Sequence, residues 1–189
     1  MEQTIIRPAT PADAGRLLEI YAYYVQHTAV SFEYEVPSLT EFEGRIRHTL
    51  TRYPYLIVQE GERILGYAYA GAFHPRAAFA WACEMTIYLD PAAHKKGLGR
   101  KLYEALEAEL QRLGFLNLYA CIACPEAEDE YLTNNSPAFH AHMGYVEIGR
   151  FHHCGYKFGR WYHMIWMEKL IGSHENGAAL KVPAAWKPT

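Results

Sequence analysis

One stretch of the chain, residues 80–113, limits the possible folds more than any other. Residues 80–89 form an apolar, strand-like run, and Asp90-Pro91 ends it. After Gly97-Leu98-Gly99 the apolar residues take helical spacing, with leucines at positions 102, 106, 110 and 113. The first N–H groups of a helix have no partner inside it and carry the positive end of its dipole. The sequence therefore predicts an anion site where a strand leads into a long helix.

The residues around this helix start suit a pyrophosphate group. Gly97 and Gly99 let a phosphate approach the main chain closely, and Lys95, Lys96 and Arg100 supply positive charge. The glycine–lysine spacing of a nucleotide-triphosphate loop is absent, which excludes that motif. The third glycine of a dinucleotide-binding fingerprint is also absent, which excludes that motif as well. A tight glycine turn with a solvated lysine face would give the same pattern. The motif alone therefore does not distinguish an anion site from a turn, and the residues around it must decide.

The other periodic segments predict an α+β fold. The pattern predicts strands over residues 3–7, 55–59, 64–73, 117–123, 146–154 and 161–170, and further helices that start near Thr10, Ser38 and Ser136. Such an order buries one sheet under helices. We assign residues 1–171 to a single domain and expect residues 172–189, which have little periodicity, to form a flexible C-terminal tail.

Composition excludes several classes of protein. A formal charge of -3 is too close to neutral to attract a nucleic acid or an anionic membrane. The N-terminus lacks the basic and apolar parts of a signal peptide, and no apolar run approaches the roughly 18 residues of a membrane span. The four cysteines suit a reduced protein better than a disulfide scaffold, so we expect a cytoplasmic location.

No metal site is expected from the cysteines or histidines. Cys121 and Cys124 form a C-x-x-C pair without a second pair at ligand spacing, and we interpret them as packing residues. His152 and His153 are neighbours on a predicted strand, where side chains alternate between faces. They should therefore not both reach one ion.

The motifs resemble those of the GNAT superfamily of N-acetyltransferases over roughly residues 3–171. The strand E-M-T-I-Y-L is followed by H-K-K-G-L-G, a helix and N-S-x-x-F-H-x-x-x-G-Y. The segments A-Y-A-G, W-A-C-E and G-Y-K-F-G are similar to the phosphinothricin and methionine sulfone acetyltransferase group. The resemblance implies a GNAT-type fold, with a mixed, mostly antiparallel sheet of about seven strands flanked by helices.

The resemblance also implies acetyl-CoA as co-substrate. In the family the strand holds the pantetheine arm and the helix start holds the pyrophosphate. This assigns the cofactor to Met85, Ile87, Leu89, Lys95, Lys96, Gly97, Leu98, Gly99, Arg100, Asn135 and Ser136. Two positions depart from the family pattern: His94 replaces the usual glutamine or arginine, and Thr133 stands where an asparagine is usual.

Glu84 is the candidate general base. Its apolar neighbours favour burial, which raises the pKa of a carboxyl group, and the group that the chain resembles has its catalytic glutamate here. Without the resemblance, a strand carboxylate is more often ion-paired or at the sheet surface. His140 stands where many members carry a tyrosine acid, and it is either the acid or a structural helix residue bonded to a carbonyl.

The resemblance implies a small-molecule, amino-acid-like amine as substrate. Arg76 would bind its carboxylate or phosphinate, and Phe32 and Phe79 would wall the pocket; a solvated arginine and two core phenylalanines are the alternative. Two other functions stay open: a non-catalytic acyl-CoA-binding or sensing domain, which needs no base, and an acetyltransferase for a protein N-terminus or lysine. The 15 tyrosines would also serve the interface of a homodimer.

Overall fold

The computed structural model describes residues 3–93, 97–177 and 180–188. Within these residues, seven strands form one sheet in the order β1-β2-β3-β4-β5-β7-β6. The strands are β1 (Thr4–Pro8), β2 (Tyr55–Glu60), β3 (Arg63–Ala72), β4 (Ala82–Leu89), β5 (Asn117–Cys124), β6 (Val146–Lys157) and β7 (Arg160–Leu170). Strands β4 and β5 are parallel, and every other neighbouring pair is antiparallel. The predicted mixed, mostly antiparallel sheet is confirmed.

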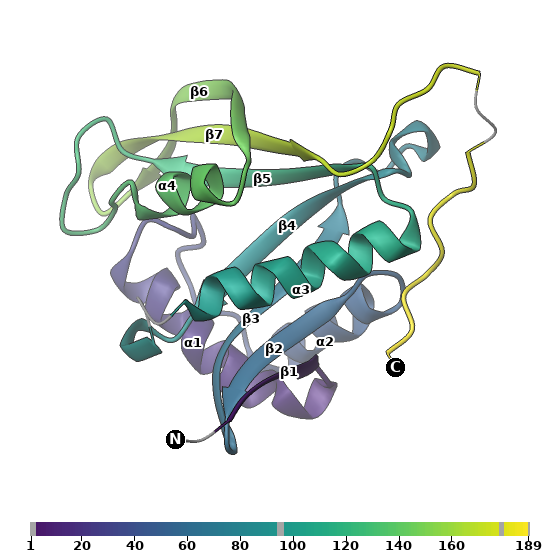
Figure 1. Ribbon diagram of the computed structural model, residues 1–189. Coiled ribbons are helices and arrows are strands. Elements are labelled where there is room, and N and C mark those ends of the chain that lie inside the picture. The colour runs from purple at the N-terminus through teal and green to yellow at the C-terminus, as the bar shows by residue number, and fades with distance from the viewer. Residues whose placement is uncertain (1–2, 94–96, 178–179, 189) are drawn as a thin grey trace.

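Helices cover both faces of this sheet (Figure 1). The α-helices of the described residues are α1 (Ala14–His27), α2 (Leu39–Leu50), α3 (Leu98–Leu113) and α4 (Asn135–His142). Helices α1 and α2 lie on one face and α3 lies on the other. The predicted cap of α2 is present, because the Ser38 hydroxyl accepts a hydrogen bond from the Glu41 N–H at 3.2 Å. None of the described helices is long and apolar enough to cross a membrane.

Each face of the sheet has its own core. Under α3, Cys83 and Met85 of β4 pack with the leucines of the helix. On the other face the core is rich in tyrosine, and Tyr55 stacks on Tyr69 with ring centroids 4.8 Å apart. Burial of each large side chain contributes about 1.5–3 kcal/mol. Many of the tyrosines that we expected at a dimer interface therefore stabilise the interior.

Strands β4 and β5 are joined at one end. In the described residues their parallel pairing covers residues 82–84 against residues 117–119. Beyond it, residues 85–89 pair with β3 and residues 120–124 pair with β7. The sheet is thus open between the later parts of β4 and β5, at the end of β4 that leads into α3.

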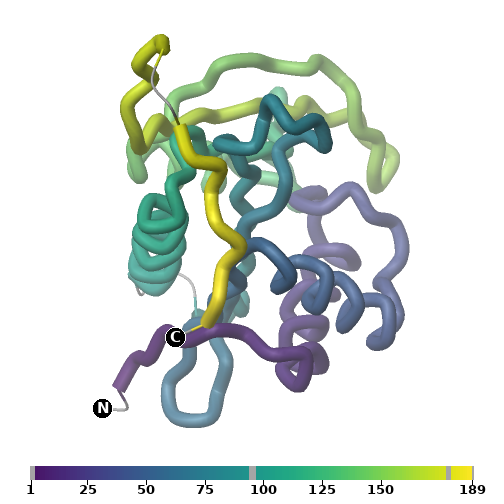
Figure 2. Tube along the Cα trace, turned by 90° about the vertical axis from the view of Figure 1, so that its right-hand side faces the viewer, coloured from purple at the N-terminus to yellow at the C-terminus, as the bar shows by residue number. Residues whose placement is uncertain are grey.

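The C-terminal segment differs from the predicted flexible tail. Trp186 is 4% exposed and belongs to the core under α3. Its N–H donates to the carbonyl of Arg52 at 2.9 Å, and its indole Nε1 donates to the Glu109 carboxylate at 2.8 Å. Figure 2 shows this segment running extended beside α3. Because one aromatic side chain anchors it, the segment has no periodicity that sequence reasoning could detect.

Candidate active site

Some main-chain N–H groups of β4 face the opening of the sheet. The Asp90 N–H donates to Leu65 of β3 at 2.8 Å, so it points toward β3. Because N–H groups alternate in direction along an extended strand, those of Met85, Ile87 and Leu89 point toward β5. The last pairing of β4 with β5 is Glu84 with Tyr119, and the Met85 N–H lies at this last rung. Beyond it the strands diverge, so the N–H groups of Ile87 and Leu89 face the gap.

The start of α3 is built for an anion. Gly97 is its N-cap, with a φ of 72° that glycine adopts without strain, and no described side chain caps this end. The N–H groups of residues 98–100 precede the bond from the Lys101 N–H to Gly97 at 3.2 Å. A Cβ at Gly99 would lie 3.2 Å from Leu89 Cδ1, so glycine lets α3 pack closely on β4. These groups suit the predicted pyrophosphate.

The structure describes only some of the charged residues that were predicted around this helix start. Lys95 and Lys96 lie outside the described residues. Arg100 is described; its side chain is 61% exposed, and its Nε donates to the Glu104 carboxylate at 2.7 Å. An exposed pair of this kind contributes about 0–1 kcal/mol, so the guanidinium is available to a phosphate. Asn135 and Ser136 form the first turn of α4, and the Asn135 side chain is exposed.

Glu84 lies on the face opposite α3. Its neighbours Cys83 and Met85 are buried under α3, so the alternation of the strand places Glu84 on the other face. The side chain is half-buried, and burial raises the pKa of its carboxyl group. An ion pair would have lowered this pKa instead. This environment suits a general base and does not support the alternative of an ion-paired strand carboxylate.

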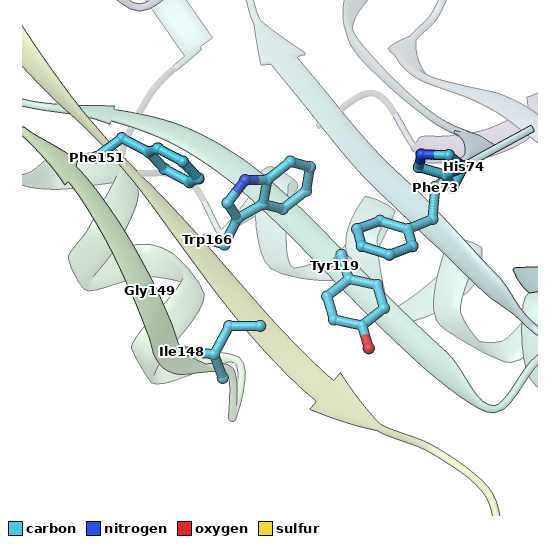
Figure 3. Close-up of a pocket in the computed structure, with 7 residues that line it drawn as sticks. All are labelled: Phe73, His74, Tyr119, Ile148, Gly149, Phe151 and Trp166. Atoms are coloured by element: carbon cyan, nitrogen blue, oxygen red, sulfur yellow. The ribbon is translucent and has the colours of Figure 1, made fainter. Parts of the chain in front are cut away.

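The register of the sheet places Glu84 between two cavities. Its β5 partner, Tyr119, lines a cavity of about 370 Å³, and Cys121 and Tyr88, further along β5 and β4, line a cavity of about 350 Å³. We call the first the Trp166 cavity; it is lined by Phe73, His74, Tyr119, Ile148, Gly149, Phe151 and Trp166 (Figure 3). We call the second the Phe32 cavity; it is lined by Tyr21, Val30, Ser31, Phe32, Glu33, Tyr88, Cys121, Ala123 and Met164.

The structure separates the three residues predicted to bind the substrate. Phe32 lines the Phe32 cavity, whereas Arg76 and Phe79 follow β3 on the other side of Glu84. The Phe79 ring meets Phe73 of the Trp166 cavity, with centroids 5.7 Å apart. Arg76 is exposed. The expected single aromatic pocket is therefore two separate sites.

Sequence reasoning missed several residues of the Phe32 cavity. Tyr88 lies four residues after Glu84, so strand alternation would have placed it on the same face. Cys121 was interpreted as a packing residue, but it is exposed and lines the cavity. Cys124 is buried, as expected, because three residues along a strand reverse the face.

His140 is held by hydrogen bonds at both ring nitrogens. The residue is 3% exposed, its Nδ1 donates to the Ser136 carbonyl at 2.8 Å, and its Nε2 accepts from the Tyr103 hydroxyl at 3.0 Å. Burial lowers the pKa of the imidazole, which keeps it neutral. Of the two predicted roles, the structure favours the structural one.

His152 and His153 do not alternate as predicted. Phe151 pairs with Met164 and Gly155 pairs with Tyr162, so residues 152–154 all lie opposite the single residue between these partners. This is a β-bulge, and His153 has a φ of 47°, in the left-handed region. Both imidazole rings consequently approach that of His163, with centroids 5.1 and 4.5 Å away.

The resulting histidine cluster stabilises the bulge through a hydrogen bond. Glu126, His153 and His163 have ligand atoms close enough for a metal ion. However, His163 Nδ1 accepts the N–H of His153 at 2.9 Å, so the other nitrogen of the neutral ring carries the proton. A metal-bound histidine instead donates from its second nitrogen. The donor set therefore does not fit a metal.

The comparisons with known proteins agree with the fold. The sequence model of the acetyltransferase (GNAT) domain matches residues 6–166. The phosphinothricin N-acetyltransferase of Streptomyces viridochromogenes is 31% identical, over 83% of this chain and 82% of that protein. The L-methionine sulfoximine/L-methionine sulfone acetyltransferase of Salmonella typhimurium is also 31% identical, over 89% of this chain and 95% of that protein.

A solved structure shows the same arrangement. The GNAT superfamily phosphinothricin acetyltransferase from Sinorhizobium meliloti, in complex with acetyl-CoA, superposes with a TM-score of 0.82 at 30% identity, covering 93% of this chain and 95% of that chain. The family match spans both the split sheet and α3. The chain therefore belongs to the GNAT family and is an acetyl-CoA-dependent N-acetyltransferase.

Proposed function

We propose that this protein transfers the acetyl group of acetyl-CoA to the primary amine of a small, amino-acid-like substrate, such as phosphinothricin, methionine sulfone or methionine sulfoximine. The main support is Glu84, a half-buried carboxyl group with a raised pKa where β4 and β5 begin to diverge. The names of the relatives support the substrate class.

In the proposed reaction, Glu84 acts as the general base. Its carboxylate takes a proton from the substrate ammonium, and the neutral amine attacks the thioester carbonyl. The C–N bond forms, the attacking nitrogen loses its second proton to solvent, the C–S bond breaks, and CoA leaves as a thiolate that takes a proton from solvent; Glu84 then returns its own proton to solvent. The main chain of Met85, Ile87 and Leu89 would hold the pantetheine arm during these steps. The N–H groups of residues 98–100 would hold the pyrophosphate.

The Phe32 cavity is the proposed acceptor site. It lies on the same face of the sheet as Glu84, since Tyr88 and Cys121 of its lining share that face. An amine bound there would meet the carboxylate without crossing the sheet. Arg76 follows β3 on the other side of Glu84 and is absent from the lining of this cavity, so the proposed acceptor site does not use its guanidinium.

We also propose a cytoplasmic homodimer that associates through β6 and β7. Large apolar side chains are exposed on these strands: Val146, Ile148, Phe151, Tyr156 and Trp161. Patches of this kind mark interfaces. The free cysteines suit a reducing compartment. Sedimentation equilibrium should give twice the chain mass of 21.6 kDa, and the mass of one chain would contradict the dimer.

The proposed function is tested by CoA release from acetyl-CoA in the presence of different amines. The panel contains phosphinothricin, methionine sulfone, methionine sulfoximine, proteinogenic amino acids, polyamines and peptides with free N-termini. We expect kcat/KM to be highest for the amino-acid analogues. A preference for peptides would contradict the substrate class, and release that does not depend on any amine would contradict acetyl transfer itself.

A further inference from the structure

Lys157, at the end of β6, is a buried cation. It is 2% exposed, and its Nζ donates to the carbonyls of Thr28 at 2.9 Å and Ser31 at 2.6 Å. The Nζ also lies 5.1 Å from the centroid of the Phe158 ring. Burial lowers the pKa of this amine, although the Glu33 carboxylate opposes the shift. Burial of an ammonium group is costly unless its donors are satisfied, so the two carbonyls are essential to its position.

The two carbonyls belong to the segment between α1 and α2 that forms one wall of the Phe32 cavity. Val30, Ser31, Phe32 and Glu33 of this segment all line the cavity. In both views the segment lies beside the end of the β6–β7 hairpin (Figure 1 and Figure 2). Lys157 therefore fixes the cavity wall from a distant part of the chain, because its two hydrogen-bond partners lie 129 and 126 residues earlier in the sequence.

Gly155, on the same strand, touches the side chain of that wall. A Cβ at Gly155 would lie 2.3 Å from two ring atoms of Phe32, far inside any real contact. The ring packs on other sides against the small cluster of Ala29, Ala123 and Tyr162, and it borders the cavity. A side chain at position 155 would therefore push the Phe32 ring into the cavity.

We propose that Gly155 and Lys157 together set the position of Phe32 and so determine how large an acceptor amine the protein accepts. This inference rests on the proposed function, because it takes the Phe32 cavity as the acceptor site. Lys157 is a positioning residue, since it acts through the carbonyls of Thr28 and Ser31 and not on the substrate. Gly155 determines specificity through its lack of a side chain.

Gly155→Ala tests the steric part of the proposal. The added methyl group should lower kcat/KM for methionine sulfone about tenfold or more, because one methylene in an apolar pocket changes discrimination by about 10–200-fold. The value for glycine or alanine as acceptor should change less than twofold, as should the KM for acetyl-CoA. Gly44→Ala is the matched control, because a Cβ there meets open space.

A second substitution in the same chain makes this test specific. Phe32→Leu shortens the displaced side chain, so Gly155→Ala combined with Phe32→Leu should recover much of the activity toward methionine sulfone. Residues in direct contact give such non-additive effects, whereas independent sites give additive ones. Additive losses in the double variant would overturn the proposed role of Gly155.

Lys157→Met tests the positioning part. Methionine keeps an unbranched side chain but leaves two carbonyls without their donor. The KM for the amine should rise about tenfold, while kcat and the KM for acetyl-CoA stay within about twofold, and Lys157→Arg should retain part of the amine affinity. Lys169→Met is the control, because it removes a part-buried ion pair to Glu107 elsewhere in the fold.

The outcomes separate this inference from the function on which it rests. A wild-type protein without amine-dependent CoA release would contradict the proposed function. An active wild type whose Gly155→Ala variant loses small and large amines equally would overturn the inference. The same holds if Lys157→Met raises the KM for acetyl-CoA as much as that for the amine. Should Lys157→Met fail to fold, Gly155→Ala and its double variant still decide the question.

Discussion

Glu84→Gln should lower kcat at neutral pH by about 100-fold or more and leave the affinity for acetyl-CoA unchanged. General-base catalysis contributes about 10²–10⁴-fold, and an amide cannot accept the proton. The change preserves shape, and Glu84 faces away from α3, where the proposed pyrophosphate site lies. Steady-state kinetics and calorimetric titration with acetyl-CoA measure the two quantities.

The matched control for this variant is Glu168→Gln. Glu168 pairs with Tyr119 on the next strand, so it is a nearby carboxylate outside the proposed chemistry. Its kcat should stay within a few-fold of the wild-type value. Turnover of Glu84→Gln equal to that of the wild type would remove Glu84 as the base.

The pH dependence of activity and stability should separate the loss of a base from a loss of folding. Burial raises the pKa of Glu84, so the acid limb of kcat/KM should lie above the ordinary glutamate value of about 4.3. A carboxyl group with a raised folded-state pKa adds most stability below its unfolded pKa and loses it as pH rises through the folded pKa. Glu84→Gln should therefore be at least as stable as the wild type at neutral pH.

Trp186→Ala should destabilise the protein by about 3–5 kcal/mol, since removal of a buried tryptophan leaves a large cavity. The Glu109 carboxylate also loses the hydrogen bond from the indole N–H. Urea unfolding followed by circular dichroism gives the free energy of unfolding for each variant.

Leu180→Ala is the control in the same segment. Leu180 is 47% exposed, so its truncation should change the free energy of unfolding by about 0.5 kcal/mol or less. Equal, small effects of the two substitutions would mean that the C-terminal segment is not held by Trp186.

Local patterns in the sequence predicted much of the fold. The leucine spacing after Gly99 and the apolar, strand-like run of residues 80–89 predict the strand and the helix that meet at the proposed pyrophosphate site. The capping hydroxyl of Ser38 correctly marks the start of α2. These features depend on residues that are close together in the sequence, so the sequence alone is enough to predict them.

Features that depend on distant neighbours were not predictable. The bulge at His153 exists because two strands change register, which no pattern within β6 reveals. A lysine is usually exposed, so the burial of Lys157 contradicts its own residue type and becomes clear only when the carbonyls of Thr28 and Ser31 are in place. The proposed role of Glu84 came mainly from resemblance, because burial of a carboxylate is set by tertiary packing.

The divergence of β4 from β5 has a consequence for how such proteins evolve. Three residue pairs join the two halves of the sheet there, in the described residues. One half carries Glu84 and the groups proposed for acetyl-CoA; the other carries Gly155, Lys157 and part of the Phe32 cavity. Mutations can therefore accumulate in the second half without disturbing the donor site.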